Sequence, residues 1–174
     1  MTTLTLIACG YLVQAQSLKS EKSESKMVIQ GTSSLHDWES IVESFDVQSK
    51  LDKDQIVDIQ FTATVKSIKS GKSGMDSNTY KALKEDKYPE IKFSSEGLNI
   101  QGDQLTGKGQ LTIAGKSQEI PIKLTINQNA KTTVSGKIKI KMTDYDITPP
   151  TAVFGTIKTG DDITIQFNIT LIKS

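Results

Sequence analysis

The chain of 174 residues contains no arginine, because all 21 of its basic residues are lysine. Arginine is the usual side chain for reading guanine edges and for holding carboxylate or phosphate through two parallel hydrogen bonds. The 20 acidic residues nearly balance the lysines and leave a formal net charge of +1. A chain with balanced charge and no arginine is a poor candidate for a nucleic-acid-binding protein, so we expect no nucleic-acid partner.

Cysteine and histidine are almost missing as well, with Cys9 and His36 as single examples. A zinc site made of histidine and cysteine needs about three or four ligands, which these two residues cannot supply. Aromatic residues make up only 6% of the chain, so its core must be built mainly from Ile, Leu and Val. We therefore expect no metal and no cofactor. The length of the chain separately predicts a single domain.

The first fifteen residues carry no charge and hold a short apolar run. The run ends at Val13-Gln14-Ala15, which has the small-x-small pattern of a signal-peptide cleavage site. It is shorter than the roughly 20 residues that a transmembrane helix needs. We interpret residues 1–15 as a signal peptide of a periplasmic or secreted protein. Alternatively, residues 6–9 (Leu-Ile-Ala-Cys) resemble a bacterial lipobox, and the protein would be a lipoprotein anchored through Cys9.

Residues 16–26 form a polar segment rich in lysine, glutamate and serine. Such a composition has little apolar surface to bury. We therefore predict a solvated leader over residues 16–26 and a folded domain over residues 27–174.

Alternation of apolar and polar residues dominates the folded domain. Five segments alternate regularly and three less regularly: 57–65, 105–113, 120–126, 134–142 and 163–171, then 26–31, 38–50 and 90–100. This period indicates antiparallel strands with one apolar face and one wet face. Eight long strands joined mostly by short turns favour closure, because closure removes exposed edges. The sequence predicts an all-β fold, an eight-stranded antiparallel up-and-down barrel of the lipocalin-like kind.

A short helix is predicted between strands 3 and 4, over residues 75–84. Asp76 or Ser77 can cap its start. Tyr80 and Leu83 lie three positions apart and would share a face of the helix. Pro89 ends any helical structure that follows.

A second interruption of the alternation covers residues 144–158. The adjacent Pro149 and Pro150 exclude a central strand there. Two apolar residues, Val153 and Phe154, follow these prolines. We predict that this pair forms a small apolar plug.

The inward-facing rows carry no Asp, Glu, Lys or His in the five regular strands. An eight-stranded barrel either fills its interior or holds one small ligand. Inward glycines such as Gly109 and Gly136 would leave space or mark bends, so the pattern leaves both options open. A cavity of this kind could not run acid–base catalysis and would suit an elongated apolar molecule. The large apolar residues that we expect at such a ligand are Phe45, Phe61, Phe93, Leu111 and Phe167.

His36 and Trp38 follow Gly31 in a segment that we place at a barrel mouth. His36 can bind the backbone, contact a ligand head group or act in catalysis, and the pattern favours them in that order. Asp37 is an unsuitable catalytic partner, since neighbours on a strand face opposite sides. Trp38 is either a core plug or a ligand platform.

The lysine row at 137, 139 and 141 lies on the outer face of one predicted strand. A solvated surface that resists aggregation is one interpretation. Transient contact with an anionic membrane surface during lipid exchange is the other.

Four stretches in this order resemble the YceI-like family of bacterial lipocalin-like proteins. They are Gly31-Thr32-Ser33-Ser34-Leu35-His36-Asp37-Trp38, Met75 through Leu83, Tyr88-Pro89-Glu90-Ile91-Lys92-Phe93, and Ala152 through Lys158. The resemblance spans about residues 27–173. It implies a barrel that binds a long polyisoprenoid chain, with quinones or polyprenyl phosphates as the ligand class, in a protein exported to the periplasm. Positions near the family's pocket would correspond to His36, Trp38, Tyr80, Leu83, Phe93 and Phe154.

The function expected from these observations is that of a non-enzymatic carrier or sequestering protein for an amphiphilic isoprenoid lipid. The alternatives are a stress or interaction protein with a filled barrel, and an enzyme that acts on a lipid head group through His36. The missing arginine favours a neutral, quinone-like head over a pyrophosphate. The oligomeric state could be monomer or homodimer.

Overall fold

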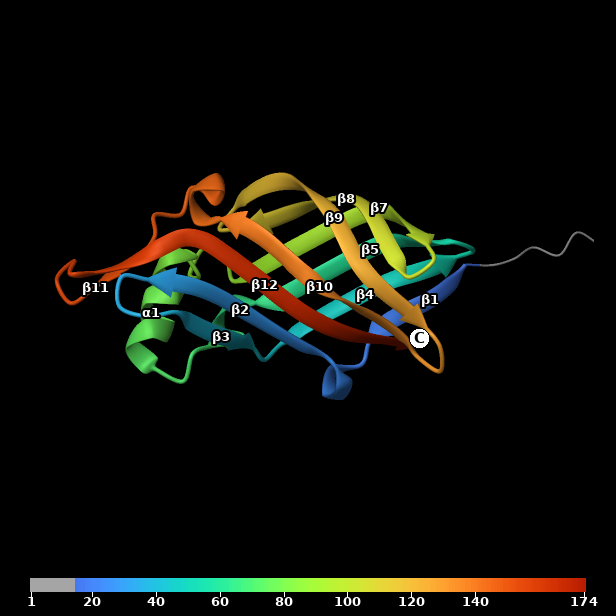
Figure 1. Cartoon of the computed structure of the whole chain (residues 1–174), viewed down its shortest axis with the longest axis horizontal. Coiled ribbons are helices and arrows are strands. Elements are labelled where there is room, and N and C mark those ends of the chain that lie inside the picture. The colour runs from blue at the N-terminus through green and yellow to red at the C-terminus, as the bar shows by residue number, and fades with distance from the viewer. Residues whose placement is uncertain (1–14) are drawn as a thin grey trace, which may run out of the picture.

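The computed structural model describes residues 15–174, which form a closed antiparallel barrel with one α-helix at one end (Figure 1). The predicted signal peptide falls almost wholly on residues 1–14, and it lies outside the described residues, as does Cys9. The strands are β1 (Gln16–Ser20), β2 (Lys26–Ser33), β3 (Trp38–Val42), β4 (Phe45–Asp52), β5 (Gln55–Thr64), β6 (Ile68–Lys69), β7 (Glu90–Gln101), β8 (Gln104–Ile113), β9 (Lys116–Gln128), β10 (Thr132–Lys141), β11 (Thr151–Ala152) and β12 (Ile157–Lys173). The helices are α1 (Ser73–Ala82) and the short 3-10 helices η1 (Lys22–Glu24), η2 (Val65–Ser67) and η3 (Met142–Tyr145).

These strands occupy eight positions around the barrel, as the sequence predicted. One edge of β12 pairs with β10, and its other edge pairs first with β2 and then with β1. β1 and β2 are thus two halves of one barrel position, separated by η1, and β3 and β4 form the next position in the same way. β5, β7, β8, β9 and β10 complete the circle. β6 and β11 are two-residue additions at the end of the barrel that carries α1.

The single α-helix of residues 15–174 lies where the sequence predicted it, although the extra short strands now place it between β6 and β7. It begins at Ser73, earlier than expected, and Lys72 at its start makes no side-chain cap. Asp76 instead accepts hydrogen bonds from the backbone nitrogen and the hydroxyl of Ser70, at 2.8 and 2.6 Å. These bonds lower the pKa of the Asp76 carboxyl. No helix in the described part of the chain is long and apolar enough to span a membrane.

The solvated leader predicted for residues 16–26 is wrong. Gln16–Ser20 is strand β1, which bridges β4 and β12, and Leu18 is only 4% exposed. Alternation in this short strand is hidden by its many polar residues, and only its two neighbours give Leu18 a core to join. The ordered barrel therefore begins near residue 16 rather than at Met27.

A bulge in β5 changes which residue of its first half faces inward. Asp58 has a φ of +52°, and the register between β4 and β5 shifts at this point. An extra residue in one strand reverses the alternation on its far side. Ile56 is therefore buried and Val57 is half-exposed, the reverse of the prediction, whereas Ile59, Phe61 and Ala63 face inward as expected.

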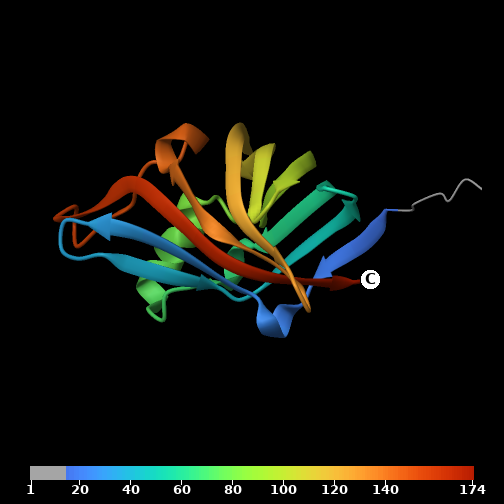
Figure 2. The ribbon, with the colours of Figure 1, turned by 45° about the vertical axis from the view of Figure 1, so that its right-hand side comes forward.

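The neighbouring strands β9 and β10 pair over only part of their length. Their register runs from Thr132–Gln128 to Ser135–Thr125, and β10 then diverges from β9 toward η3 (Figure 1 and Figure 2). η3 contacts β9, β10 and β12 at the point where the two strands have separated. At the end of the chain termini all neighbouring strands of the barrel are thus paired. At the end of α1, β9 and β10 are separated and η3 lies between them.

Candidate ligand-binding cavity

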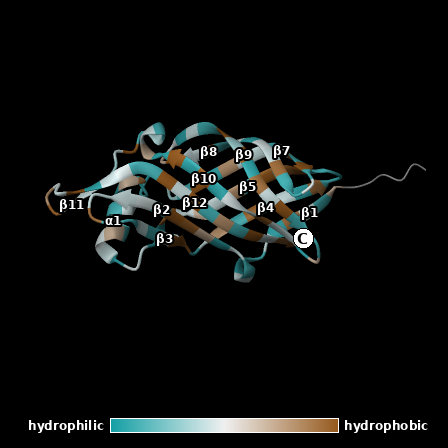
Figure 3. Cartoon of the chain, viewed as in Figure 1, coloured by the Kyte–Doolittle hydropathy of each residue, from teal (hydrophilic) through white to brown (hydrophobic). Residues whose placement is uncertain are grey.

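An apolar cavity of about 240 Å³ runs through the barrel. Aliphatic and aromatic side chains from the strands and from α1 form nearly all of its wall, and Figure 3 shows the alternation that brings them inward. Among residues 15–174, no Asp, Glu, Lys or His lines it. The polar residues of the wall are Trp38, Ser40, Ser49, Thr79 and Tyr145. The prediction of a charge-free interior is confirmed. Of the two options that the sequence left open, a filled barrel and a barrel with a cavity, the structure has the cavity.

The inward glycines are not the cause of this cavity. The aromatic ring of Phe93 lies where a side chain at Gly109 would be. In the same way, a Cβ added at Gly136 would lie only 2.5 Å from a methyl carbon of Leu124. Neither glycine contributes to the wall of the cavity. These two glycines therefore allow close packing of Phe93 and Leu124 and do not create the space.

Tyr145 fills part of the opening between β9 and β10. It is 1% exposed, and it packs in a cluster with Leu111, Ile113, Ala114 and Ile147. Its hydroxyl has no hydrogen-bond partner among residues 15–174. Burial, with a smaller contribution from Asp144, raises the pKa of Tyr145 to about 12.

Polar contacts on two sides hold η3, and with it Tyr145, against the flanking strands. Thr143 donates hydrogen bonds from its backbone nitrogen and its hydroxyl to Asp161 on β12, at 2.9 and 2.7 Å, and these bonds lower the pKa of the Asp161 carboxyl. On the other side, the amide of Gln118 on β9 donates to the carbonyl oxygen of Asp144 at 2.7 Å. η3 therefore replaces the missing ladder between β9 and β10.

Six of the predicted ligand-binding residues come together in the wall of the cavity. Phe61, Phe93, Leu111 and Phe167 face inward from four different strands, and Leu83 follows the last turn of α1. Trp38 lies across Gly31, whose missing side chain leaves room for the indole ring, and its Nε1 donates to the carbonyl of Thr32 at 3.0 Å. Part-exposed Trp38, Thr79 and Pro150 end the wall near α1, so the mouth lies among them.

Phe45 and Tyr80 lie outside the cavity. Phe45 is buried against Phe61, with ring centroids 6.1 Å apart. The Tyr80 hydroxyl lies 3.0 Å from the carbonyl of Lys66 and 3.1 Å from that of Ile68, and it accepts a hydrogen bond from Lys69. Tyr80 thus fastens α1 to the segment before it.

His36 and Phe154 are also placed away from the cavity wall. His36 is exposed in the turn between β2 and β3, and its Nδ1 lies 2.6 Å from the carbonyl oxygen of Asp37, in keeping with a role in backbone hydrogen bonding. Phe154 is fully exposed in the loop between β11 and β12. The apolar plug predicted at Val153 and Phe154 is therefore wrong, because the two-residue strand β11 carries this loop outward as a hairpin.

Sequence reasoning missed several residues of the wall. Tyr145, Ile147 and Pro150 come from the second interruption, where the sequence predicts an apolar plug at Val153 and Phe154 only, and Thr79 comes from α1. Only the apolar spacing of Tyr145 and Ile147 signalled burial, and nothing local in the sequence indicates that η3 enters the gap between two strands. Within residues 15–174, no group of three or more His, Cys, Asp or Glu side chains could hold a metal ion.

Comparisons with known proteins agree with this geometry. Residues 17–171 match the YceI-like domain. No curated protein matches the sequence. BcnA from Burkholderia cenocepacia is similar in structure, with a TM-score of 0.74 and 21% identity over 88% of this chain and 99% of its own.

Two further solved structures share the fold. A polyisoprenoid binding domain from Saccharophagus degradans, implicated in plant cell wall breakdown, has a TM-score of 0.67 and 10% identity over 91% of this chain and 99% of its own. A YceI protein from Campylobacter jejuni has a TM-score of 0.61 and 21% identity over 78% of this chain and 84% of its own. At these identities the likeness concerns the fold.

Proposed function

The chain belongs to the YceI-like domain family, and on that premise we propose that it binds a long isoprenoid lipid in its barrel and carries or sequesters it. The observation that supports this most strongly is the charge-free wall of the cavity. A lipid tail gains about 0.8 kcal/mol for each methylene that it buries, so such a wall can hold an isoprenoid chain with few polar contacts. The polyisoprenoid-binding domain with the same fold is consistent with this ligand class.

The head group of the proposed ligand is neutral. A buried phosphate would need cationic partners, because an unpaired charge in an apolar site is costly. Over residues 15–174 the wall offers no cation, and the chain has no arginine to reach in from the mouth. A quinone-like head near the mouth, with only hydrogen-bonding requirements, fits these residues better than a polyprenyl phosphate.

A binding role also fits the site better than a catalytic one. General acid–base catalysis needs titratable groups within hydrogen-bond reach of the reacting atoms. His36 lies in an exposed turn and binds the backbone, and it forms no part of the cavity wall. We therefore propose that the protein releases its ligand unchanged.

Solvent extraction of the purified protein followed by mass spectrometry tests the proposal. We expect an isoprenoid quinone or a similar neutral lipid in the extract. A barrel that carries no lipid and has no affinity for added isoprenoid quinone would contradict lipid binding, and an extracted polyprenyl phosphate would contradict the neutral head alone.

A matched pair of variants locates the ligand. Ile165 on β12 faces the cavity, and its neighbour Thr164 lies outside the wall. Ile165→Trp should fill the space and lower the amount of bound lipid, whereas Thr164→Trp should leave it unchanged. Equal lipid content in both variants would place the ligand elsewhere.

We further propose that the protein is exported, either as a soluble protein after removal of residues 1–15 or as a lipoprotein through Cys9. Cell fractionation of the wild type and Cys9→Ala separates the two routes. A membrane-bound wild type that becomes soluble on Cys9→Ala supports the lipoprotein, and an unchanged soluble protein of lower mass supports the signal peptide. A full-length cytoplasmic protein would contradict export.

A further inference from the structure

Three large apolar side chains are exposed together at the open end of the barrel. Leu35 is 66% exposed, Val153 62% and Phe154 fully. Leu35 lies in the turn between β2 and β3, and the other two lie in the hairpin between β11 and β12. We name these three residues the apolar tip, and Figure 3 shows the hydrophobic loop beyond β11.

Backbone contacts hold the two loops of the apolar tip side by side. The backbone nitrogen of Ser34 donates to the carbonyl of Lys158 at 2.9 Å, and the nitrogen of Lys158 donates to the Ser34 hydroxyl at 3.1 Å. Both loops lie at the same extremity of the molecule in Figure 1. The apolar tip is therefore built from two segments far apart in the sequence, which hydrogen bonds hold together.

The backbone of the hairpin is strained where it presents these side chains. Val153 has a φ of +50° and Phe154 a φ of +53°. This left-handed region is unfavourable for residues with a Cβ, and most of all for a β-branched one. Strain of this kind persists at sites that bind or switch, and here it keeps two apolar side chains in solvent.

Charge distinguishes the hairpin of the apolar tip from the rest of the surface, whereas the turn that carries Leu35 also holds the exposed Asp37. No charged residue occurs from Ile147 to Ile157, although 24% of the chain is charged. The turns at the opposite end instead carry charges, at Asp52, Lys53, Asp54, Asp103 and Lys131. The uncharged, hydroxyl-bearing hairpin with exposed Val153 and Phe154 complements the interface of a lipid bilayer rather than an ionic partner.

The tip is continuous with the cavity. Pro150, which precedes β11, belongs to the cavity wall, and so does Ile163 on the strand that leaves the hairpin. Trp38, which ends the wall at the mouth, follows directly on the turn that carries Leu35. A bilayer that receives the tip would therefore face the mouth.

We propose that the apolar tip inserts into the interface of a lipid bilayer, so that the mouth of the barrel faces the membrane from which the ligand is taken. The purpose of this membrane contact, uptake of the ligand, rests on the proposed function. The membrane binding itself rests on the apolar tip alone. It assigns membrane contact to Leu35, Val153 and Phe154, and the lysine row at 137, 139 and 141 takes no part.

Sedimentation with vesicles of pure phosphatidylcholine tests the proposal. The double variant Leu35→Ser/Phe154→Ser should partition about tenfold or more weakly than the wild type, since each removed side chain forfeits the burial of a large apolar group. Ile41→Ser is the matched control, because Ile41 is 44% exposed on β3 away from the tip, and it should partition as the wild type does. Lys137→Glu/Lys139→Glu should also leave partitioning unchanged.

A wild type that does not partition, a tip variant that partitions equally, or loss on reversal of the lysines would each overturn the proposal. Dimers of the wild type that the tip variant abolishes, without partitioning, would show a self-association surface and overturn it too. The outcome is separable from that of the extraction experiment. If the protein partitions into vesicles but carries no lipid, membrane binding by the tip is supported and the carrier function is contradicted. If it carries lipid but does not partition, the carrier function is supported and membrane binding by the tip is contradicted.

Discussion

The two ends of the barrel differ in how completely their strands are paired. At the end of the chain termini every strand is paired, and Ile56, Leu98 and Leu105, which also line the cavity, are at most 3% exposed. At the end of α1, β9 and β10 have separated, and Phe93 and Phe167 face open space. One sequence pattern thus produces a closed end that stabilises the fold and an open end that offers a site.

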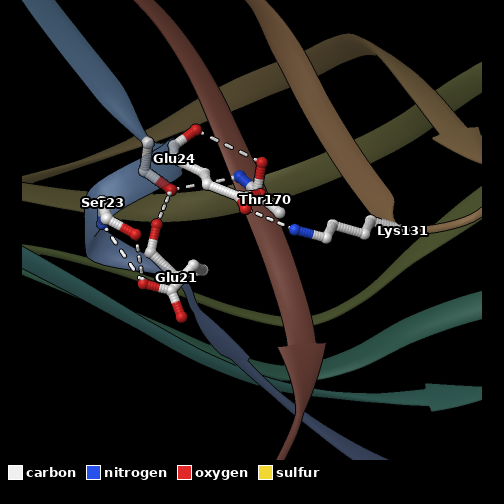
Figure 4. Close-up of polar contacts among 6 residues, drawn as sticks. Glu21, Ser23, Glu24, Lys131 and Thr170 are labelled. Carbon is white, nitrogen blue, oxygen red and sulfur yellow. Dashed lines mark hydrogen bonds and ion pairs between the residues drawn. The ribbon is translucent and has the colours of Figure 1, made fainter.

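Polar contacts hold irregular segments at both ends, including η3 at the open end. At the closed end, Glu21 and Glu24 at η1 bind Ser23 and Lys131, and the hydroxyl of Thr170 donates to the carbonyl of Glu24 at 3.2 Å (Figure 4). These contacts fasten the break between β1 and β2 to β12. At the open end, the hydroxyl of Tyr145 has no partner within residues 15–174. The hydroxyl of Ser49, opposite Leu18 at the closed end, also has no partner within residues 15–174, so unsatisfied groups occur at both ends.

The largest effect is expected from truncating a leucine at each end. Leu105→Ala at the closed end should cost about 2–5 kcal/mol of unfolding free energy, because it removes a fully buried side chain and enlarges the cavity that this side chain lines. Leu83→Ala at the open end should cost roughly 1 kcal/mol, because its side chain is only half-buried and loses less apolar burial. Urea denaturation with unchanged m-values measures both. Equal losses would show that the two ends are packed alike.

The Tyr145 hydroxyl provides the next largest effect. Its pKa is about 12 in the folded protein and near 10 in the unfolded chain. The unfolded state therefore ionises first, and stability that is complete below pH 10 should fall by roughly 2–3 kcal/mol as the pH rises to 12. Tyr145→Phe should be at least as stable at pH 7, since it removes an unpartnered buried group. The unfolding free energy of Tyr145→Phe should not show this part of the decrease between pH 10 and pH 12. Parallel plots of unfolding free energy against pH for the wild type and the variant would contradict the prediction.

A smaller gain is expected from relieving the strained hairpin. Val153→Gly should raise the unfolding free energy by about 1 kcal/mol, because glycine tolerates a positive φ. Thermal melting measures the change, and Thr151→Gly on the adjoining strand β11 is the control that should not stabilise. A destabilised Val153→Gly would show that the valine side chain makes contacts which outweigh the strain.

The smallest effect concerns the ion pair of Lys131 and Glu24 at the closed end. Both side chains are about half exposed, at 52% and 42%. Exposed pairs contribute about 0–1 kcal/mol and are screened by salt. Lys131→Ala should therefore lower stability by less than about 1 kcal/mol, and the difference should vanish at high salt. A larger loss of stability that does not depend on salt would show that this ion pair contributes substantially to the stability of the closed end.

The sequence predicted the barrel well because alternation is a local property. Five regular segments became β5, β8, β9, β10 and β12, and their inward rows are free of charge as expected. The prediction was wrong where the alternation is short or shifts by one residue. β1 carries one strongly buried apolar residue, Leu18, and the bulge at Asp58 shifts its strand by one position without any marker in the sequence.

The candidate site was predicted in part for the same reason. Phe61, Phe93, Leu111 and Phe167 belong to alternating strands, and they line the cavity. The residues that close or flank the mouth lie in irregular segments, where no period assigns a direction to a side chain. Tyr145 turned inward and Phe154 outward, although both are aromatic residues of the same interruption.

The sequence by itself determined an eight-position antiparallel barrel with an uncharged inner face, because side chains that alternate along a strand must face opposite sides of a sheet. It also excluded an arginine-based site for a charged head group. The tertiary structure decided where the barrel is empty and which end is open. Those features depend on how far β9 and β10 pair and on where η3 inserts, and such contacts between distant segments leave no local pattern to read.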